Sequence, residues 1–161
     1  MKTMKILVLS DSHREMENMH KAVLRENPDM IFHLGDHYKD AKLLHSEFPD
    51  IPMHAVRGNC DYGSQNTEQF LTIENTRIFL CHGHLYHVKY EFLTLEYAAR
   101  EKNADIVLFG HTHRSFYTEN EGLHMLNPGS IGEPRDPVGP TYGLIFLEKG
   151  QIFIRIIPVY S

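Results

Sequence analysis

Five short segments of the chain carry the side chains that bind metal ions in proteins. Each combines aspartate, asparagine or histidine with glycine or serine, and each directly follows a short apolar run. The segments are Asp11-Ser12-His13, Gly35-Asp36, Gly58-Asn59-Cys60-Asp61, His82-Gly83 and Gly110-His111-Thr112-His113. Carboxylate, amide and imidazole donors together suit borderline divalent ions such as Mn²⁺, Fe²⁺, Ni²⁺ or Zn²⁺. The pattern therefore predicts a site for such ions.

The spacing and the number of these donors favour two ions over one. Asp11 and His13 are two residues apart, and His111 and His113 repeat that spacing. In an extended segment each pair points to one side and can bind one ion. Calcium would need more oxygen donors, and a structural zinc site usually uses more cysteine. Two ions on the order of 3.5–4 Å apart can clamp the attacking and leaving oxygens of an in-line displacement.

A single motif of this kind is more often structural, because a histidine near a strand end usually serves as a hydrogen-bonded surface or core residue. Here the surrounding sequence argues otherwise. Short, branched apolar runs at 5–9, 30–34 and 53–56 are typical of buried strands. Apolar residues recur at helical spacing from Met16 to Val23 and from Ala41 to Phe48, and a proline follows each stretch. This order predicts parallel strands whose carboxyl ends converge on one ligand crevice.

The second half of the chain is richer in expected strands. A hairpin is predicted from 70–73 and 77–80 around Glu74-Asn75, followed by a helix through Tyr90, Leu93 and Tyr97 and a buried strand at 105–109. Four more strands are expected at 115–119, 123–126, 141–147 and 151–158, with Glu121-Gly122 and Lys149-Gly150 as turns. Without a repeat or linker, we expect one α/β domain over residues 1–161, with two sheets covered by helices.

Composition limits the kinds of partner and the compartment that we expect for this protein. The formal net charge is -5, so no bulk basic field gathers nucleic acid or an anionic membrane. No apolar run approaches the roughly 18 residues of a membrane span. With no export signal and only Cys60 and Cys81, a reducing cytoplasm is the expected compartment. A Cys60–Cys81 disulfide is the disfavoured alternative.

In this order the DSH, GD, GNCD, HG and GHTH motifs resemble those of the calcineurin-like metallophosphoesterases, above all their small bacterial and archaeal phosphodiesterase branch. The resemblance runs from Lys5 to about Arg135 and includes Asn127-Pro128-Gly129-Ser130. It implies a four-layer αββα sandwich of two mixed β-sheets flanked by helices, with a dinuclear metal centre. By motif position it implies that Asp11, His13 and His113 bind one ion, that Asn59, His82 and His111 bind the other, and that Asp36 bridges both.

The implied activity is hydrolysis of a small phosphate ester, a phosphodiester first and a phosphomonoester as a further substrate. The nucleophile would be a hydroxide that bridges the two ions, and manganese is the expected metal, with Ni²⁺, Fe²⁺, Zn²⁺ and Mg²⁺ as alternatives. Two divalent ions, two carboxylates and one hydroxide leave a formal charge of about +1, enough to hold a phosphodiester on an acidic chain. The expected catalytic residues are Asp36, Asn59, Cys60 and His82.

Cys60 departs from the commonest form of the motif, which has a histidine that is thought to protonate the leaving group. A thiol with a reference pKa of about 8.5 donates a proton less readily than an imidazolium at about 6.5. Cys60 thus predicts a preference for good leaving groups, such as those of aryl diesters. The other interpretation is a small packing residue.

Several neighbours of the expected ligands stay ambiguous. Arg14 and Arg135 either contact the substrate phosphate or are solvated, and Asp61 either orients a ligand or caps a turn. His37 and His84 lie next to expected ligands and are predicted to face away.

Two rival functions remain. A subunit of the eukaryotic retromer coat resembles this fold but serves as a non-catalytic protein-interaction scaffold with eroded metal positions. Here all seven positions hold the expected residue type, which favours an enzyme. A nuclease is disfavoured because the chain lacks a basic stripe with interleaved aromatic residues. Phe153 and Ile157 in the terminal hairpin either mediate association of copies or are buried.

Overall fold

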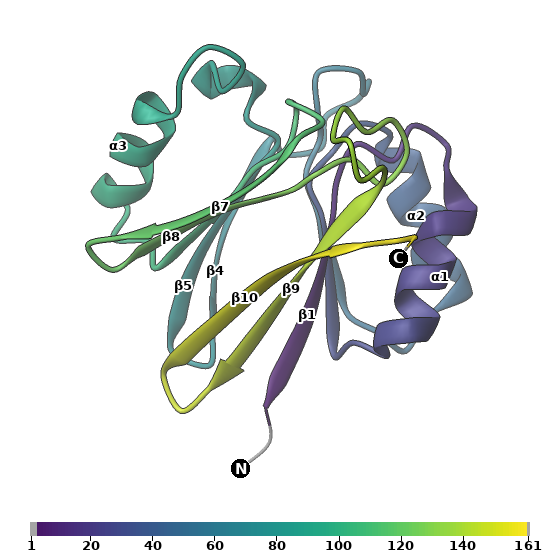
Figure 1. Cartoon of the computed structure of the whole chain (residues 1–161), viewed down its shortest axis with the longest axis horizontal. Helices are drawn as coiled ribbons and strands as arrows, with labels where there is room; N and C mark the ends of the chain where they lie inside the picture. Colours follow the sequence, from purple (N-terminus) through teal and green to yellow (C-terminus); the bar gives the residue numbers. More distant parts are fainter. Residues whose placement is uncertain (1–2, 161) are drawn as a thin grey trace.

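The computed structural model describes residues 3–160, which form two β-sheets packed face to face with helices on their outer sides (Figure 1). The strands are β1 (Met4–Leu9), β2 (Met30–His33), β3 (Met53–Ala55), β4 (Glu68–Ile73), β5 (Thr76–Cys81), β6 (Ile106–Leu108), β7 (Ser115–Asn120), β8 (Leu123–Pro128), β9 (Thr141–Glu148) and β10 (Gln151–Pro158). The helices are α1 (Met16–Glu26), α2 (Tyr38–Glu47), the short 3₁₀ helix η1 (His84–Tyr86) and α3 (Leu93–Glu101).

Both sheets mix parallel and antiparallel strands. The first has the order β10-β9-β1-β2-β3, in which β1, β2 and β3 are parallel, β9 is antiparallel to β1, and β10 is antiparallel to β9. The second has the order β4-β5-β6-β8-β7, in which β5, β6 and β8 are parallel and the two edge strands are antiparallel. The predicted β-α-β-α-β start of the chain is confirmed.

The alternation of side chains along β1 explains the layers. Ile6 and Val8 point into the core between the two sheets, whereas Leu7 and Leu9 pack beneath α1 and α2. Strand β5 repeats this alternation against α3. Because side chains of a strand alternate between its faces, a strand apolar on both faces can serve two cores at once. Figure 1 shows the result, with α3 on one side of the sheets and α1 and α2 on the other, so the predicted αββα sandwich is confirmed.

The predicted hairpin turns are also confirmed, and their backbone explains why they form. Glu74 and Asn75 both adopt left-handed conformations, with φ of 51° and 62°. Glu121-Gly122 and Lys149-Gly150 do the same. Two consecutive residues with positive φ match the twist of the flanking antiparallel strands, which fixes the strand register.

Helix α3 corrects one prediction. The helix was expected from the spacing of Tyr90, Leu93 and Tyr97, but it begins at Leu93 and buries Leu95 and Ala99 instead. Tyr90 lies before the helix and is 88% exposed. The periodicity identified the helix but not its buried face, because the small Ala99 packs closely on the sheet while the larger tyrosines remain outside.

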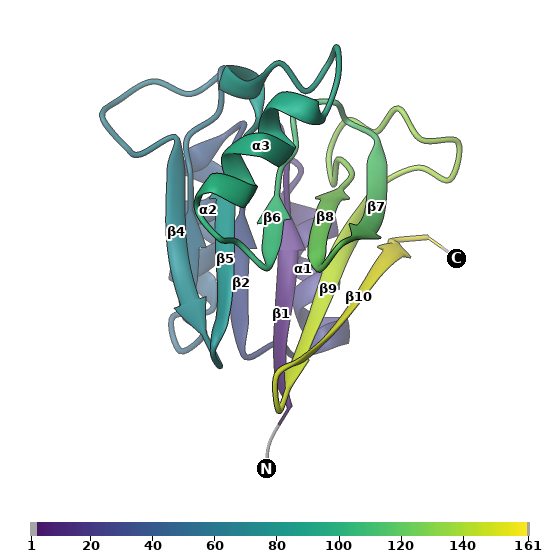
Figure 2. The same cartoon turned by 90° about the vertical axis from the view of Figure 1, so that its left-hand side faces the viewer.

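The parallel strands of both sheets run toward the same end of the molecule, and the loops that follow them meet there (Figure 2). Hydrogen bonds link these loops, including Gly110 N to the carbonyl of His82 at 2.8 Å and Ile131 N to the carbonyl of Ser10 at 3.1 Å. Cys60 and Cys81 are free thiols. No helix within residues 3–160 is long and apolar enough to cross a membrane.

Candidate metal centre

Two buried carboxylates, from Asp11 after β1 and Asp36 after β2, lie at the centre of these loops. Nε2 of His82, which follows β5, lies 3.7 Å from Oδ1 of Asp11 and 3.4 Å from Oδ2 of Asp36. Nε2 of His113 lies 3.4 Å from Oδ1 of Asp11. Residues from four separate loops therefore present donor atoms to one point, as the sequence predicted.

The donor atoms form two groups that share one carboxylate. One group comprises Asp11, His13, Asp36 and His113, and the other comprises Asp36, His82 and His111. Within each group the candidate ligand atoms all lie within 4.8 Å of one another. Asp36 is common to both groups. The motifs imply the same partition of these residues, with Asn59 added to the second group, and this assignment of ligands to two ions stays a prediction.

The backbone at these positions is unusual. Five of the candidate ligands have positive φ between 42° and 72°, namely Asp11, His13, Asp36, His111 and His113. Non-glycine residues seldom adopt this conformation, although Asp and His tolerate it better than most. Each instance costs on the order of 1 kcal/mol and persists only where the surrounding structure enforces it. Such strain concentrates at functional sites.

Close packing of the loops enforces this backbone, and glycines make the packing feasible. A Cβ at Gly110 would collide with Oγ of Ser10 and lie 2.7 Å from Oδ2 of Asp11. A Cβ at Gly58 would collide with Oδ1 of Asp36. The glycines of the GNCD and GHTH motifs therefore let neighbouring loops approach the two carboxylates directly.

Backbone carbonyl groups orient the imidazoles. Nδ1 of His82 donates to the carbonyl of Leu34 at 2.8 Å, and Nδ1 of His113 donates to the carbonyl of Glu133 at 2.6 Å. A carbonyl only accepts, so both rings carry a proton on Nδ1 and turn Nε2, the nitrogen available for a metal ion, toward the carboxylates. The Glu133 carboxylate also lies 3.1 Å from Nδ1 of His13. Sequence reasoning missed Glu133, whose only signal is its place shortly after the family-like Asn127–Ser130 segment.

The electrostatics of the site keep both carboxylates ionised. Burial raises the pKa of Asp36, but its contacts with His82 and with the backbone N–H of Cys60 outweigh burial and hold that pKa well below its usual range. Burial likewise raises the pKa of Asp11, and the contacts with His113 and His82 outweigh it. Burial lowers the pKa of His111 to about 4, which leaves its ring neutral. Burial lowers the pKa of His82, but its contacts with Asp36 and Asp11 outweigh burial and raise it, and contact with Asp11 raises the pKa of His113. These two rings therefore favour the protonated form in the protein alone, and a bound metal ion would displace those protons.

Two buried atoms test whether a metal fits. Oδ1 of Asp11 and Nε2 of His13 are buried and have no hydrogen-bond partner among the described residues. Buried polar atoms are rarely left unpaired unless something else satisfies them. A divalent ion would do so, since carboxylate and imidazole are its preferred donors. The donor set therefore fits the metals that the motifs imply.

Asn59 and Cys60 lie at the exposed rim of the site. The Asn59 amide donates to Sγ of Cys60 at 3.7 Å, and Cys60 N donates to Oδ1 of Asp36 at 2.9 Å. Burial, together with the Asp36 carboxylate, raises the pKa of Cys60 to about 11.

Asp61 accepts from Gly58 N and Tyr38 N, which matches the turn-capping interpretation of this residue.

His37 and His84 correct a prediction, because neither ring faces away. The ring centroid of His37 lies 5.0 Å from that of His13, and the His84 centroid lies 5.5 Å from that of His82. The physical reason is local: positive φ at His37 and at Gly83 turns the chain back at both places. Both rings therefore line the site.

Comparison with known proteins identifies the family to which the chain belongs. The family model of the calcineurin-like phosphoesterase superfamily domain matches residues 4–150. The chain therefore belongs to this superfamily, whose members bind divalent metals. A probable metallophosphoesterase of Bacillus subtilis is 34% identical over 94% of this chain and 89% of its own length.

Two solved structures, whose proteins carry different names, share this fold. An archaeal phosphodiesterase is 25% identical, with a TM-score of 0.73 over 96% of this chain and all of its own. Vps29 of Entamoeba histolytica in complex with Zn²⁺ is 21% identical, with a TM-score of 0.70 over 97% of this chain and 99% of its own. The second likeness concerns the fold alone.

Proposed function

We propose that this protein is a metal-dependent phosphodiesterase that holds two divalent ions per chain. The observation that carries the proposal is the Asp36 carboxylate, which belongs to both donor groups. Asn59, at the rim beside Cys60, would complete the second group. Mn²⁺ is the expected ion, with Ni²⁺, Fe²⁺, Zn²⁺ and Mg²⁺ as alternatives. The likeness to an archaeal phosphodiesterase supports diesters as the substrate class.

Bound ions would supply Lewis acidity at the phosphoryl oxygens and lower the pKa of a water that serves as the nucleophile. The chain's own residues hold and orient the site. Asp11 and Asp36 provide the negative charge, the carbonyl groups of Leu34 and Glu133 fix two imidazoles, and Cys60 stands at the rim as the candidate donor to the leaving group. Little rearrangement is needed, because these contacts exist in the protein alone.

The test combines metal analysis with turnover of bis(p-nitrophenyl) phosphate and p-nitrophenyl phosphate in the presence of Mn²⁺, Ni²⁺, Mg²⁺ or Zn²⁺. Two equivalents of metal and a preference for the diester are the expected result. Asp36→Asn serves as the matched variant, because asparagine keeps the shape and one acceptor but removes the shared charge.

A protein-interaction scaffold is the competing function, because Vps29 shares this fold. Metal content alone cannot separate the two functions, since the Vps29 structure itself holds Zn²⁺. Turnover can. If the protein binds two ions but hydrolyses neither ester with any of the four metals, the enzymatic function is refuted in favour of the scaffold function.

A further inference from the structure

A cleft of about 510 Å³ opens beside the candidate metal centre, between the start of α2 and the loop after β3. Its lining includes Arg14, Lys39, Lys42, Tyr38, Tyr62 and Cys60. This volume falls in the range of pockets that hold small molecules. The binding of metal ions by the donor groups would not by itself require a cleft of this size.

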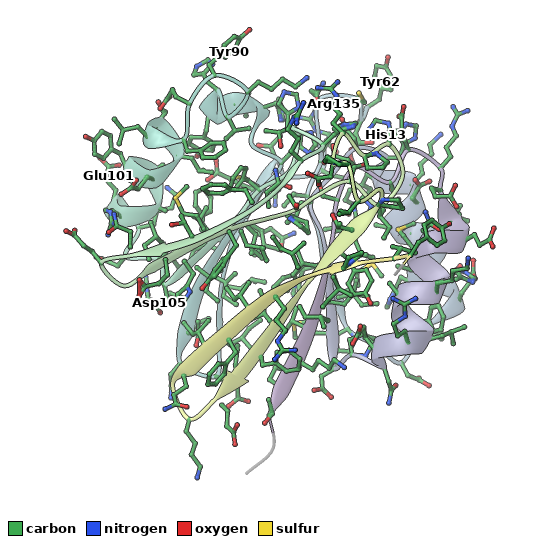
Figure 3. The ribbon with its side chains drawn as sticks, in the orientation of Figure 1. His13, Tyr62, Tyr90, Glu101, Asp105 and Arg135 are labelled. Carbon is green, nitrogen blue, oxygen red and sulfur yellow. The ribbon has the colours of Figure 1, made fainter. Side chains whose placement is uncertain are left out.

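The cleft and the donor groups share a wall. Cys60 lines the cleft while its backbone N–H donates to Oδ1 of Asp36 at 2.9 Å. His37 lines it as well, with its ring packed edge-on against the ring of His13. Figure 3 shows Tyr62 and His13 at the same end of the molecule. A phosphate at the donor groups would therefore extend one of its ester arms into the cleft.

Basic side chains outnumber acidic ones in the lining of the cleft, whereas the chain as a whole is acidic. Arg14, Lys39 and Lys42 are exposed, and none of them forms an ion pair within residues 3–160. The two acidic residues in the lining are occupied: Asp40 accepts from a serine hydroxyl and a backbone N–H, and Asp61 accepts from two backbone N–H groups. Three cations without carboxylate partners fit an anionic group on the ligand.

The cleft also offers aromatic surface. Tyr62 is 95% exposed, so its ring has little to pack against in the protein alone. Tyr38 is partly buried, with Nζ of Lys42 at 5.8 Å from its ring centroid. Exposed aromatic faces beside cations are the combination on which bases of single nucleotides stack.

We propose that this cleft binds one ester arm of the substrate, an arm that carries a second phosphate and a planar ring, as in a phosphorylated dinucleotide. The inference rests on the proposed function, because the reacting phosphate is placed at the donor groups. The reaction is a hydrolysis: the oxygen of water bonds to phosphorus, one P–O ester bond breaks, and a proton from water ends on the leaving oxygen. No further reactant is required.

The experiment compares substrates that differ by one phosphate. The dinucleotide ApA lacks a terminal phosphate, whereas pApA and ApAp carry one at the 5′ or 3′ end. With Mn²⁺ present, we expect kcat/KM for one of the phosphorylated forms to exceed that for ApA by about tenfold. In the double variant Lys39→Ala/Lys42→Ala this ratio falls to near one. Tyr62→Ala lowers kcat/KM for all three dinucleotides relative to bis(p-nitrophenyl) phosphate.

The control is Lys21→Ala, which removes one positive charge from the exposed side of α1 and should keep the wild-type ratio. Turnover of bis(p-nitrophenyl) phosphate with a ratio near one in the wild type would overturn the cleft proposal alone. A high ratio that survives in the double variant would overturn the role of its cations. Failure to hydrolyse any diester would instead overturn the proposed function, on which the cleft proposal rests.

Discussion

Oε1 of Glu133 lies 3.1 Å from Nδ1 of His13, and Nε2 of the same ring is buried without a hydrogen-bond partner among the described residues. The carbonyl of the same residue accepts a hydrogen bond from His113 at 2.6 Å. One residue after β8 thus orients two candidate ligands from different loops, one after β1 and one after β6. Partners of this kind fix the ring and raise the basicity of the nitrogen that faces the metal.

Replacing Glu133 by glutamine should lower the affinity for one of the two metal ions and leave the affinity for the other unchanged. Glu133→Gln removes the charge beside His13 but keeps the carbonyl that holds His113, so we expect a loss of about tenfold to 100-fold in affinity at the first donor group. Titration of the metal-free protein with Mn²⁺ by calorimetry measures both equivalents. Glu101→Gln, at the far end of α3 in Figure 3, removes the same charge elsewhere. Two unchanged affinities in Glu133→Gln would refute the role.

Asp36→Asn should weaken the binding of both metal ions, because Asp36 belongs to both donor groups. We expect less than one bound ion per chain and a loss of diesterase activity of more than about 100-fold, since the shared negative charge is gone. Asparagine can still accept from Cys60 N, so the fold of the loop should survive. Metal analysis, turnover and circular dichroism together test this. Asp50→Asn, an exposed loop change, is the control, and equal metal content in both variants would contradict the shared role.

The strand ends were predictable because they obey local rules. Branched apolar runs, prolines after helices and two-residue turns each act over a few neighbours, and the order of the elements then places the loops. That is why the convergence of Asp11, Asp36 and His82 could be foreseen. The division into two donor groups was implied by the motifs rather than by periodicity, and the structure now gives it distances.

Other features depend on contacts between distant segments and left no local signal. Glu133 meets His13 across more than a hundred residues of sequence, and no spacing rule connects them. The inward turn of His37 depends on its own positive φ, which the sequence does not reveal for histidine, and that of His84 depends on the positive φ of Gly83 before it. The buried face of α3 was misjudged because tyrosines at helical spacing can remain outside when small residues pack instead.

Cys60→His should broaden the range of leaving groups. Cys60 stands beside Asp36 at the rim, where a histidine would present a more acidic donor than a neutral thiol. We expect kcat/KM for alkyl diesters to rise about tenfold relative to aryl diesters, whose leaving groups need less protonation. Rates with methyl p-nitrophenyl phosphate and with dimethyl phosphate give the ratio. Cys60→Ser controls for the loss of the thiol, and an unchanged ratio in Cys60→His would favour the packing interpretation.

A stability prediction concerns Glu26, far from the metal centre. Its carboxylate accepts from the Tyr142 hydroxyl at 2.5 Å and lies 2.9 Å from Nζ of Lys5. Burial raises the pKa of Glu26, but these two contacts outweigh it and lower the pKa below 4.5. Because the folded-state pKa is depressed, the stabilisation is fully present above about pH 4.5 and is lost as pH falls through the lower folded-state value.

Tyr142→Phe should therefore destabilise the protein in a pH-dependent way. We expect a loss of about 1 kcal/mol in the free energy of unfolding near pH 7, a modest value because Glu26 is partly exposed, and a smaller loss near pH 3.5. Urea unfolding with a chelator present at both pH values excludes any contribution from metal. Tyr160→Phe is the matched control: its hydroxyl donates to Oδ1 of Asn18 at 2.7 Å, an acceptor that does not titrate. Its effect should be equal at both pH values, and a Tyr142→Phe effect that is also equal would show that Glu26 is not the group responsible.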